Sequence, residues 1–130
     1  MEDVDFSDEF CRFIQHAIPS VEAAEILLFL QKSQDRSWQV QEIIEGLRAS
    51  ITIGDADGVK WVEALQSRGL VTIGQDRRVQ YRPGSPELEE FARGLARAYT
   101  QRPVTLIRMI YALRDSKIQS FADAFRIRKS

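Results

Sequence analysis

The chain has few of the residues from which most catalytic and metal sites are built. Its 130 residues include one cysteine, Cys11, and one histidine, His16. A zinc site of the usual cysteine and histidine type needs more ligands, and no nucleophile has a histidine and an orienting acid beside it. The seven glycines never fall into a run that would cradle a phosphate group. We therefore expect no enzymatic activity, no metal and no cofactor.

Long apolar runs are also missing. No stretch approaches the ~20 consecutive apolar residues of a transmembrane helix, and the acidic start MEDVDFSDEF has no signal-peptide pattern. A single cysteine allows no internal disulfide and gives no sign of an oxidising compartment. We expect a cytoplasmic protein without membrane association. His16 is expected at the surface and Cys11 as a small buried apolar residue, with a redox-sensing thiol as the alternative.

The chain as a whole has no large excess of positive or negative charge. The chain has 18 Lys and Arg against 19 Asp and Glu, a net charge of -1, which argues against a nucleic-acid binder. The charges are nevertheless uneven, because residues 1–66 contain 13 acidic and 5 basic side chains and residues 67–130 contain 6 and 13. Separated patches can steer a charged partner even when the total vanishes. The alternative is that folding interleaves the two signs into solvated pairs.

Apolar spacing and end signals predict mostly helices. Serines at 7, 20 and 85 are placed as N-caps, and Gly69 as a left-handed C-cap. The runs LVTI and RVQYR alternate around a polar loop and predict a hairpin, with Trp38 as a small first strand packed under it. The dense apolar content of residues 20–32 places that helix in the core. The expected helices cover residues 7–16, 20–32, 41–47, 55–68, 86–99, 104–113 and 118–125.

This order of elements indicates an α+β fold that is mainly α with a small β-hairpin. Residues 20–83 resemble the winged helix-turn-helix domains of bacterial MarR-type regulators, through LQSRGLV followed by a hairpin ending in YRPG. The end of the chain, with SFADAFRIRK, is similar to small proteobacterial winged-helix proteins of unsettled function. The resemblance implies a winged helix with an extra N-terminal helix and C-terminal helices. The expected regions are an acidic arm with a short helix (1–19), the winged-helix domain (20–84) and a C-terminal helical dimerisation or packing region (85–130).

The resemblance also implies a function, that of a DNA-binding transcriptional regulator. In DNA-binding members of such families the third helix enters the major groove and the wing contacts the backbone. Here the third helix is residues 55–68 and the wing tip is residues 74–78. The expected partner is double-stranded DNA, and the candidate nucleic-acid-binding residues are Arg48, Lys60, Arg77, Arg78 and Arg82.

The composition of the third helix favours a different partner. Its predicted outward face has one cation, Lys60, and two carboxylates, Asp57 and Glu63, which would oppose binding to phosphates. The alternative function is a non-catalytic winged-helix module for protein interaction. Such a module would dock a basic partner on the acidic third-helix face or on Trp61, which is expected to flank the core.

The helix at residues 104–113 is apolar on all sides and must be buried on more than one side. Similar winged-helix proteins commonly dimerise through terminal helices, so we expect a homodimer. The alternative is a helix central to one copy, covered by residues 7–16 and 86–100. The expected interface consists of Leu106, Ile107, Met109, Ile110, Leu113, Phe121 and Phe125.

Overall fold

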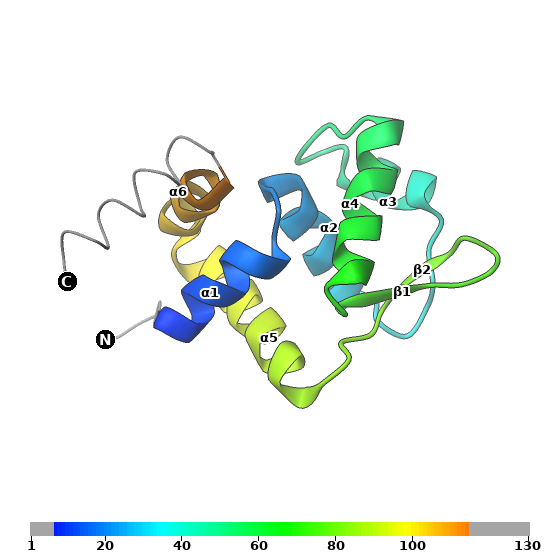
Figure 1. The fold of residues 1–130 in the computed structure, drawn as a ribbon. Coiled ribbons are helices and arrows are strands. Elements are labelled where there is room, and N and C mark those ends of the chain that lie inside the picture. The colour runs from blue at the N-terminus through cyan, green and yellow to red at the C-terminus, as the bar shows by residue number, and fades with distance from the viewer. Residues whose placement is uncertain (1–6, 115–130) are drawn as a thin grey trace.

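Six helices and one small sheet make up residues 7–114, the part of the chain that the computed structural model describes (Figure 1). The elements in chain order are α1 (Asp8–Ala17), α2 (Val21–Lys32), α3 (Val40–Leu47), α4 (Asp55–Ser67), β1 (Val71–Ile73), β2 (Val79–Tyr81), α5 (Pro86–Gln101) and α6 (Pro103–Arg114). The chain is mainly helical with a small antiparallel sheet, which confirms the α+β prediction. The helix expected at 118–125, with Phe121 and Phe125, lies outside the described residues.

Helix ends follow the predicted capping residues. The hydroxyls of Ser7, Ser20 and Ser85 each accept the backbone N–H three residues further on, at 3.0 to 3.1 Å. Each serine thereby satisfies one of the N–H groups that a helix start leaves without an internal partner. Gly69 has φ +80, the left-handed conformation that ends α4 and lets the chain turn into β1.

α2 lies between two groups of elements. Figure 1 shows α1, α5 and α6 on one side of it and α3, α4 and the hairpin on the other, and α2 contacts α6 as well as α3, α4 and β2. A helix enclosed in this way must be apolar on several faces, which explains its dense apolar sequence. Its buried residues are Val21, Ala23, Ala24, Ile26, Leu27 and Leu30.

The sheet has the predicted form. β1 and β2 are antiparallel, with Val71 opposite Tyr81 and Ile73 opposite Val79. Trp38 pairs with Val79 from the other side of β2: its N–H donates to the Val79 carbonyl at 2.8 Å and its carbonyl accepts the Val79 N–H at 2.7 Å. Trp38 therefore pairs with the hairpin as expected, but through a one-residue bridge and not a strand.

α6 is covered largely within one copy of the chain. Leu106 and Ile110, both expected at a dimer interface, are 0% and 1% exposed. α6 packs against α1 and α5, the two segments named in the alternative to a dimer. Both side chains belong to the core of a single copy.

The outer side of α6 offers other residues to a second copy. Ile107 and Met109 are half-buried, and the side chain of Leu113 lies outside the described part. Val104 and Tyr111 are 62% and 65% exposed. Homodimerisation stays a prediction, and Val104 and Tyr111 replace Leu106 and Ile110 as its candidate contacts.

None of the described helices is by itself long and apolar enough to cross a bilayer. α1 and α2 together meet the criteria of length and composition, as a pair bent by 100°.

A glycine sets the distance between α3 and α4. Gly58 is buried, and a Cβ atom at this position would lie 2.9 Å from Ile44 Cδ1 and 3.0 Å from Val40 Cγ1. The helical projection of the sequence placed Val59 in the core beside Val62 and Leu65. The structure instead buries Gly58 with Val62 and Leu65 and leaves Val59 half-buried, because the closest neighbour of α4 is α3. The inward face is therefore rotated from the expected one.

Replacing Gly58 tests this close approach. Gly58→Leu should lower the free energy of unfolding by about 1–3 kcal/mol, because a larger side chain must push α3 and α4 apart. Ala56→Leu, an exposed position on the same helix, is the matched control and should change stability by less than about 0.5 kcal/mol. Urea unfolding followed by circular dichroism measures both. Equal stability of the two variants would contradict the packing described.

Glu25 joins α2 to α5. The hydroxyl of Tyr99 donates a hydrogen bond to its carboxylate, and both side chains are half-buried. Burial raises the pKa of Glu25, and the charge of Lys32 opposes that rise. The folded protein thus holds a proton on Glu25 more tightly than the unfolded chain does.

The raised pKa of Glu25 predicts a pH dependence. Relative to Glu25→Gln, the stability of the wild type should be greatest below about pH 4, where Glu25 is protonated in both states, and should fall as pH rises through the raised pKa. Urea unfolding of both proteins between pH 4 and about pH 7 measures the difference. A difference that grew with pH would mean that the pKa of Glu25 is lowered instead.

Candidate functional site

The hairpin ends in a well-defined tip. The N–H of Gly74 donates to the Arg78 carbonyl and the N–H of Arg77 donates to the Gly74 carbonyl, both at 2.9 Å. The Asp76 carboxylate accepts the N–H of Arg78 at 3.1 Å. Arg77 has φ 67, the left-handed conformation for which such three-residue loops usually have glycine. The loop therefore presents an exposed arginine from a strained backbone position.

Trp38 fastens the base of the hairpin to the helices. Its ring meets the Phe29 ring edge-on, with centroids 4.8 Å apart, and the Arg36 guanidinium lies 3.6 Å from the Trp38 ring centroid. The Trp38 Nε1 is buried and has no hydrogen-bond partner in the described part of the chain. The indole thus holds the base of the hairpin through packing and a cation–π contact.

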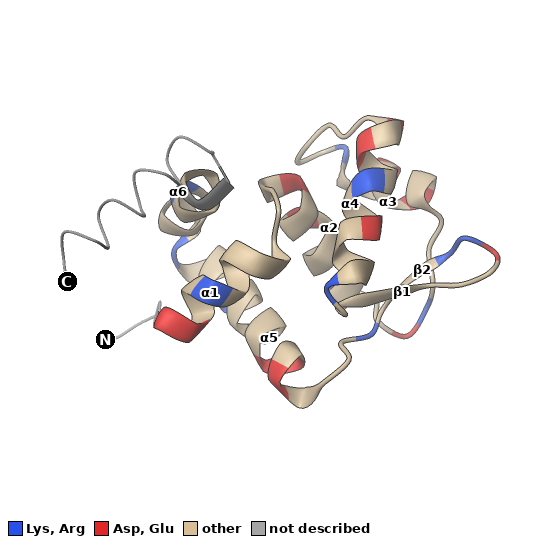
Figure 2. Ribbon diagram, viewed as in Figure 1, with Lys and Arg blue, Asp and Glu red and all other residues tan. Residues whose placement is uncertain are grey.

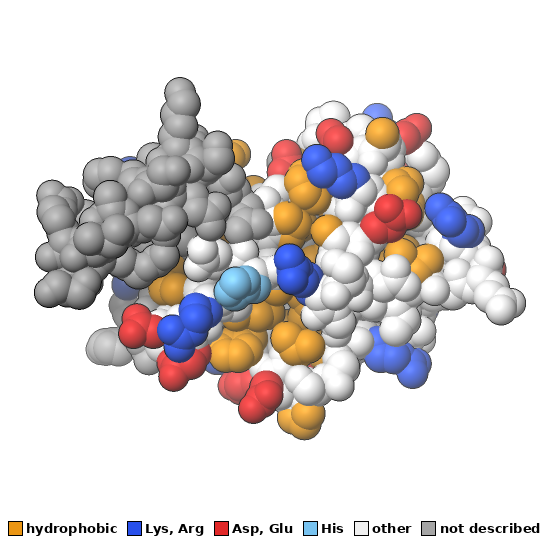
Figure 3. Space-filling view, in the orientation of Figure 1, with side chains coloured by type: hydrophobic (Ala, Val, Ile, Leu, Met, Phe, Trp, Pro, Cys, Tyr) orange, Lys and Arg blue, Asp and Glu red, His pale blue; other side chains and the backbone are white. Residues whose placement is uncertain are grey.

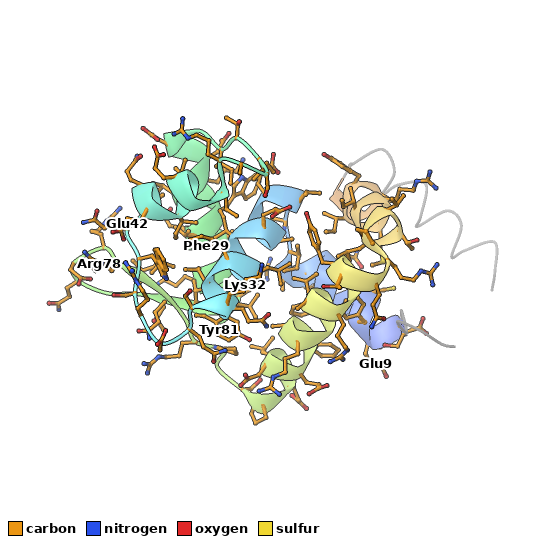
Figure 4. All side chains as sticks on the ribbon, turned by 180° about the vertical axis from the view of Figure 1, so that it is seen from behind. Glu9, Phe29, Lys32, Glu42, Arg78 and Tyr81 are labelled. Atoms are coloured by element: carbon orange, nitrogen blue, oxygen red, sulfur yellow. The ribbon has the colours of Figure 1, made fainter. Side chains whose placement is uncertain are left out.

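Ion pairs attach the hairpin to α3. Arg78 on the hairpin lies beside Glu42 on α3 (Figure 4), with Arg78 Nη1 3.7 Å from Glu42 Oε1. The same carboxylate lies 3.5 Å from Arg36 and accepts the N–H of Gln39 at the start of α3. Glu42 thus interacts with two arginines and caps the start of α3. Its carboxylate partly neutralises the charge of Arg78.

A cavity of about 680 Å³ separates α4 from the hairpin, with the start of α3 at its end. We call it the hairpin groove. Its apolar lining consists of Val40, Val59, Val62, Ile73 and Val79. Its polar and charged lining consists of Gln39, Gln41, Gln66, Asp55, Glu63, Asp76 and Arg77, together with Gly74. Among the described residues the lining thus holds three carboxylates and one guanidinium.

The structure disperses the five predicted nucleic-acid-binding residues. Arg77 lines the hairpin groove, and Arg78 points back to α3, where its guanidinium also donates to the Ser37 carbonyl at 3.4 Å. Arg82 is exposed just after β2. The hairpin therefore presents two exposed arginines, Arg77 and Arg82.

The other two lie on helices and have close neighbours. Arg48, at the end of α3, pairs with Glu45 at 2.7 Å. The Lys60 ammonium lies 4.6 Å from the ring centroid of Trp61, which is half-buried beside the core as predicted. Figure 2 shows basic and acidic residues interspersed along α3, α4 and the hairpin, and Figure 3 shows charged side chains beside apolar ones on this face of the molecule. These five cations do not form one basic surface.

The apolar lining of the groove escaped the sequence reasoning. Val59 was assigned to the core by helical periodicity, and Ile73 was assigned to a hairpin without a role. The one available signal was Ile73, an apolar residue next to the hairpin tip; it is left half-buried, whereas its partner Val79 is buried in the core. A partly exposed apolar residue beside a groove is a candidate contact for a partner.

Cys11 and His16 do not form a reactive site. Cys11 is half-buried and its thiol donates to the Met109 Sδ at 3.6 Å. Burial raises the pKa of Cys11, and the nearby charge of Asp8 raises it further, so the reactive thiolate is disfavoured. His16 is exposed, as predicted. Within the described residues no group of three or more His, Cys, Asp or Glu could hold a metal ion.

Comparison with known proteins gives no relatives: no protein-family model, curated protein or solved structure matches the chain. The function of the hairpin groove therefore has to be inferred from its shape, lining and charge.

The strain at the tip can be measured directly. Arg77→Gly should raise the free energy of unfolding by about 1 kcal/mol, because glycine adopts positive φ without steric cost. Arg77→Ala keeps the strain, removes the guanidinium and should leave stability within about 0.5 kcal/mol of the wild type. Thermal unfolding of both variants measures the difference. If Arg77→Ala were as stabilising as Arg77→Gly, removal of the charge rather than relief of strain would be the cause.

Proposed function

We propose that this chain is a non-catalytic winged-helix module that docks a protein partner in the hairpin groove. The succession of α2, α3 and α4 followed by the hairpin, with Trp38 bridged to β2, supports a winged helix-turn-helix arrangement. In that arrangement α4 is the third helix and the hairpin is the wing. The hairpin groove then occupies the concave surface between them.

The acidic and apolar lining of that surface carries the proposal. Duplex DNA has one negative charge per ~1.7 Å of its axis, and proteins bind it by neutralising phosphates. Asp55, Glu63 and Asp76 line the groove and would face such a duplex. The partly exposed Val40, Val59 and Ile73 of its lining would gain nothing from phosphates but are well suited to apolar side chains of a protein.

The DNA-binding regulator is the second candidate. Lys60, Arg77 and Arg82 are exposed, and none of them forms an ion pair with another described residue. These three cations are available for phosphate contacts, as the resemblance to MarR-type regulators implies. Their number is small for phosphate-driven affinity, which rises with each phosphate neutralised.

A DNA titration with charge-reversed variants separates the two candidates. The wild type should not bind a fluorescently labelled generic duplex measurably, even at low salt. The double variant Asp57→Lys, Glu63→Lys should bind it, with an affinity that falls steeply with salt, because its third helix then presents three lysines. Fluorescence anisotropy at several salt concentrations measures both.

The matched control keeps the change in net charge but moves it. Glu9→Lys with Glu87→Lys adds the same charge on α1 and α5 and should not create duplex binding through the groove. Salt-dependent binding by the wild type, weakened by Arg77→Ala and Arg82→Ala, would contradict the proposal and support the regulator.

A further inference from the structure

We infer that the hairpin groove receives an extended partner segment that pairs with the outer edge of β1 and carries an apolar residue flanked, two positions away on each side, by Lys or Arg. The inference rests on the proposed function and names the chemistry of its partner. Three features of the hairpin groove support it: the direction of the backbone groups of Ile73, the face on which the Ile73 side chain lies, and the sign of the charges around that side chain.

The hydrogen bonds of the sheet show which way Ile73 faces. In an antiparallel pair, each residue directs both its N–H and its carbonyl to the same neighbouring strand. Val79 uses both groups to bond Trp38. The opposed pair Ile73 and Val79 is therefore not hydrogen-bonded, and the N–H and carbonyl of Ile73 point away from β2.

The neighbouring bonds have the same alternation. Between the two strands the N–H of Gly74 donates to the Arg78 carbonyl at 2.9 Å, and the N–H of Arg82 donates to the Leu70 carbonyl at 3.1 Å. These bonds direct the backbone groups of residues 70, 72 and 74 toward β2 and those of Ile73 toward the outer edge of β1. Among the described residues the sheet consists of β1 and β2, with Trp38 on the β2 side, so no third strand covers this edge.

The side chain of Ile73 connects that edge to the groove. It lines the cavity together with Val59, Val62 and Val79. In a sheet, residues directly opposite each other on adjacent strands project from the same face. A segment added beside β1 would thus place the residue opposite Ile73 against the groove. Its neighbours two positions away would lie on that face too, and the residues between would point to the other face.

The charges around the groove determine which residues should flank the apolar residue of the partner segment. Asp55, Glu63 and Asp76 line it against Arg77. Basic side chains two positions from the apolar residue of the segment lie on the same face as that residue, which is the side of these carboxylates. Acidic side chains there would meet like charge, which disfavours a wrong partner by electrostatic repulsion.

Two peptides of equal composition test this geometry. Acetyl-TKTITKT-amide places both lysines on the face of the isoleucine, whereas acetyl-TTKIKTT-amide places them on the opposite face. The first should bind in the millimolar range or tighter and exceed the second severalfold, as expected for two exposed ion pairs. Fluorescence anisotropy of labelled peptides against the full chain measures both affinities.

Two changes test the backbone pairing. N-methylation of the peptide on the edge facing β1 should abolish binding, because it removes the donors that pair with the sheet. Ile73→Pro should do the same, because it removes an N–H that no bond within the hairpin uses. The N-methylated peptide keeps the test valid if Ile73→Pro does not fold.

A protein variant tests the charge. Asp55→Asn with Glu63→Gln should abolish the preference between the two peptides. The control Glu9→Gln with Glu87→Gln removes the same charge from α1 and α5 and should preserve it.

The outcomes separate this inference from the proposed function. Absence of peptide binding at millimolar concentration, or equal binding of both peptides with no effect of N-methylation, would overturn the inference and leave the proposed function standing. Binding of a generic duplex by the wild type would instead overturn the proposed function.

Discussion

Two hydrogen bonds between the main chains of Trp38 and Val79 hold the hairpin on the helical body. They use both backbone groups of Val79, so β2 is the central strand and β1 the outer one. The position of the groove follows from that order, because Ile73 on β1 and Val79 on β2 supply one of its walls. The contacts of Trp38 with Phe29 and Arg36 reinforce this attachment at its base. Without this attachment the hairpin would have no fixed position, and the groove would lose one of its walls.

Ion pairs between the described residues offset the separation of charge along the sequence only in part, because most of them join residues of the same half. Basic residues of the second half pair with acids near them, as Arg93 does with Glu89 at 3.2 Å and Arg97 with Glu90 at 3.8 Å. Arg78 pairs with Glu42 from the first half. Pairs this exposed contribute little to stability, but they reduce the field available to steer a polyanion. The acids of α4, in contrast, face the groove and the solvent.

The course of the chain was predictable, and the groove was not. Ser7, Ser20, Ser85 and Gly69 act locally, so their roles in ending helices could be derived from neighbouring residues alone. Trp38 was placed correctly because an apolar residue before a short helix has few positions other than against the sheet. These features depend on short-range geometry that the sequence pattern contains.

The groove depends on contacts between distant elements. Gly58 adds nothing to an apolar pattern, although its lack of a side chain brings α4 against α3 and rotates Val59 toward the groove. The pairing of Arg78 with Glu42 likewise joins residues far apart in the sequence. From the sequence alone, Arg78 and Arg77 were therefore equally good candidates for contacts with nucleic acid.

We propose that the hairpin groove binds a protein and not duplex DNA. Amide chemical shifts of isotope-labelled protein, recorded at low salt during addition of a generic duplex, test it most directly because they locate any contact residue by residue. If the groove does not bind DNA, the amide shifts of α4 and of the hairpin tip stay unchanged. Shifts concentrated at Lys60, Arg77 and Arg82, and reversed by added salt, would contradict it.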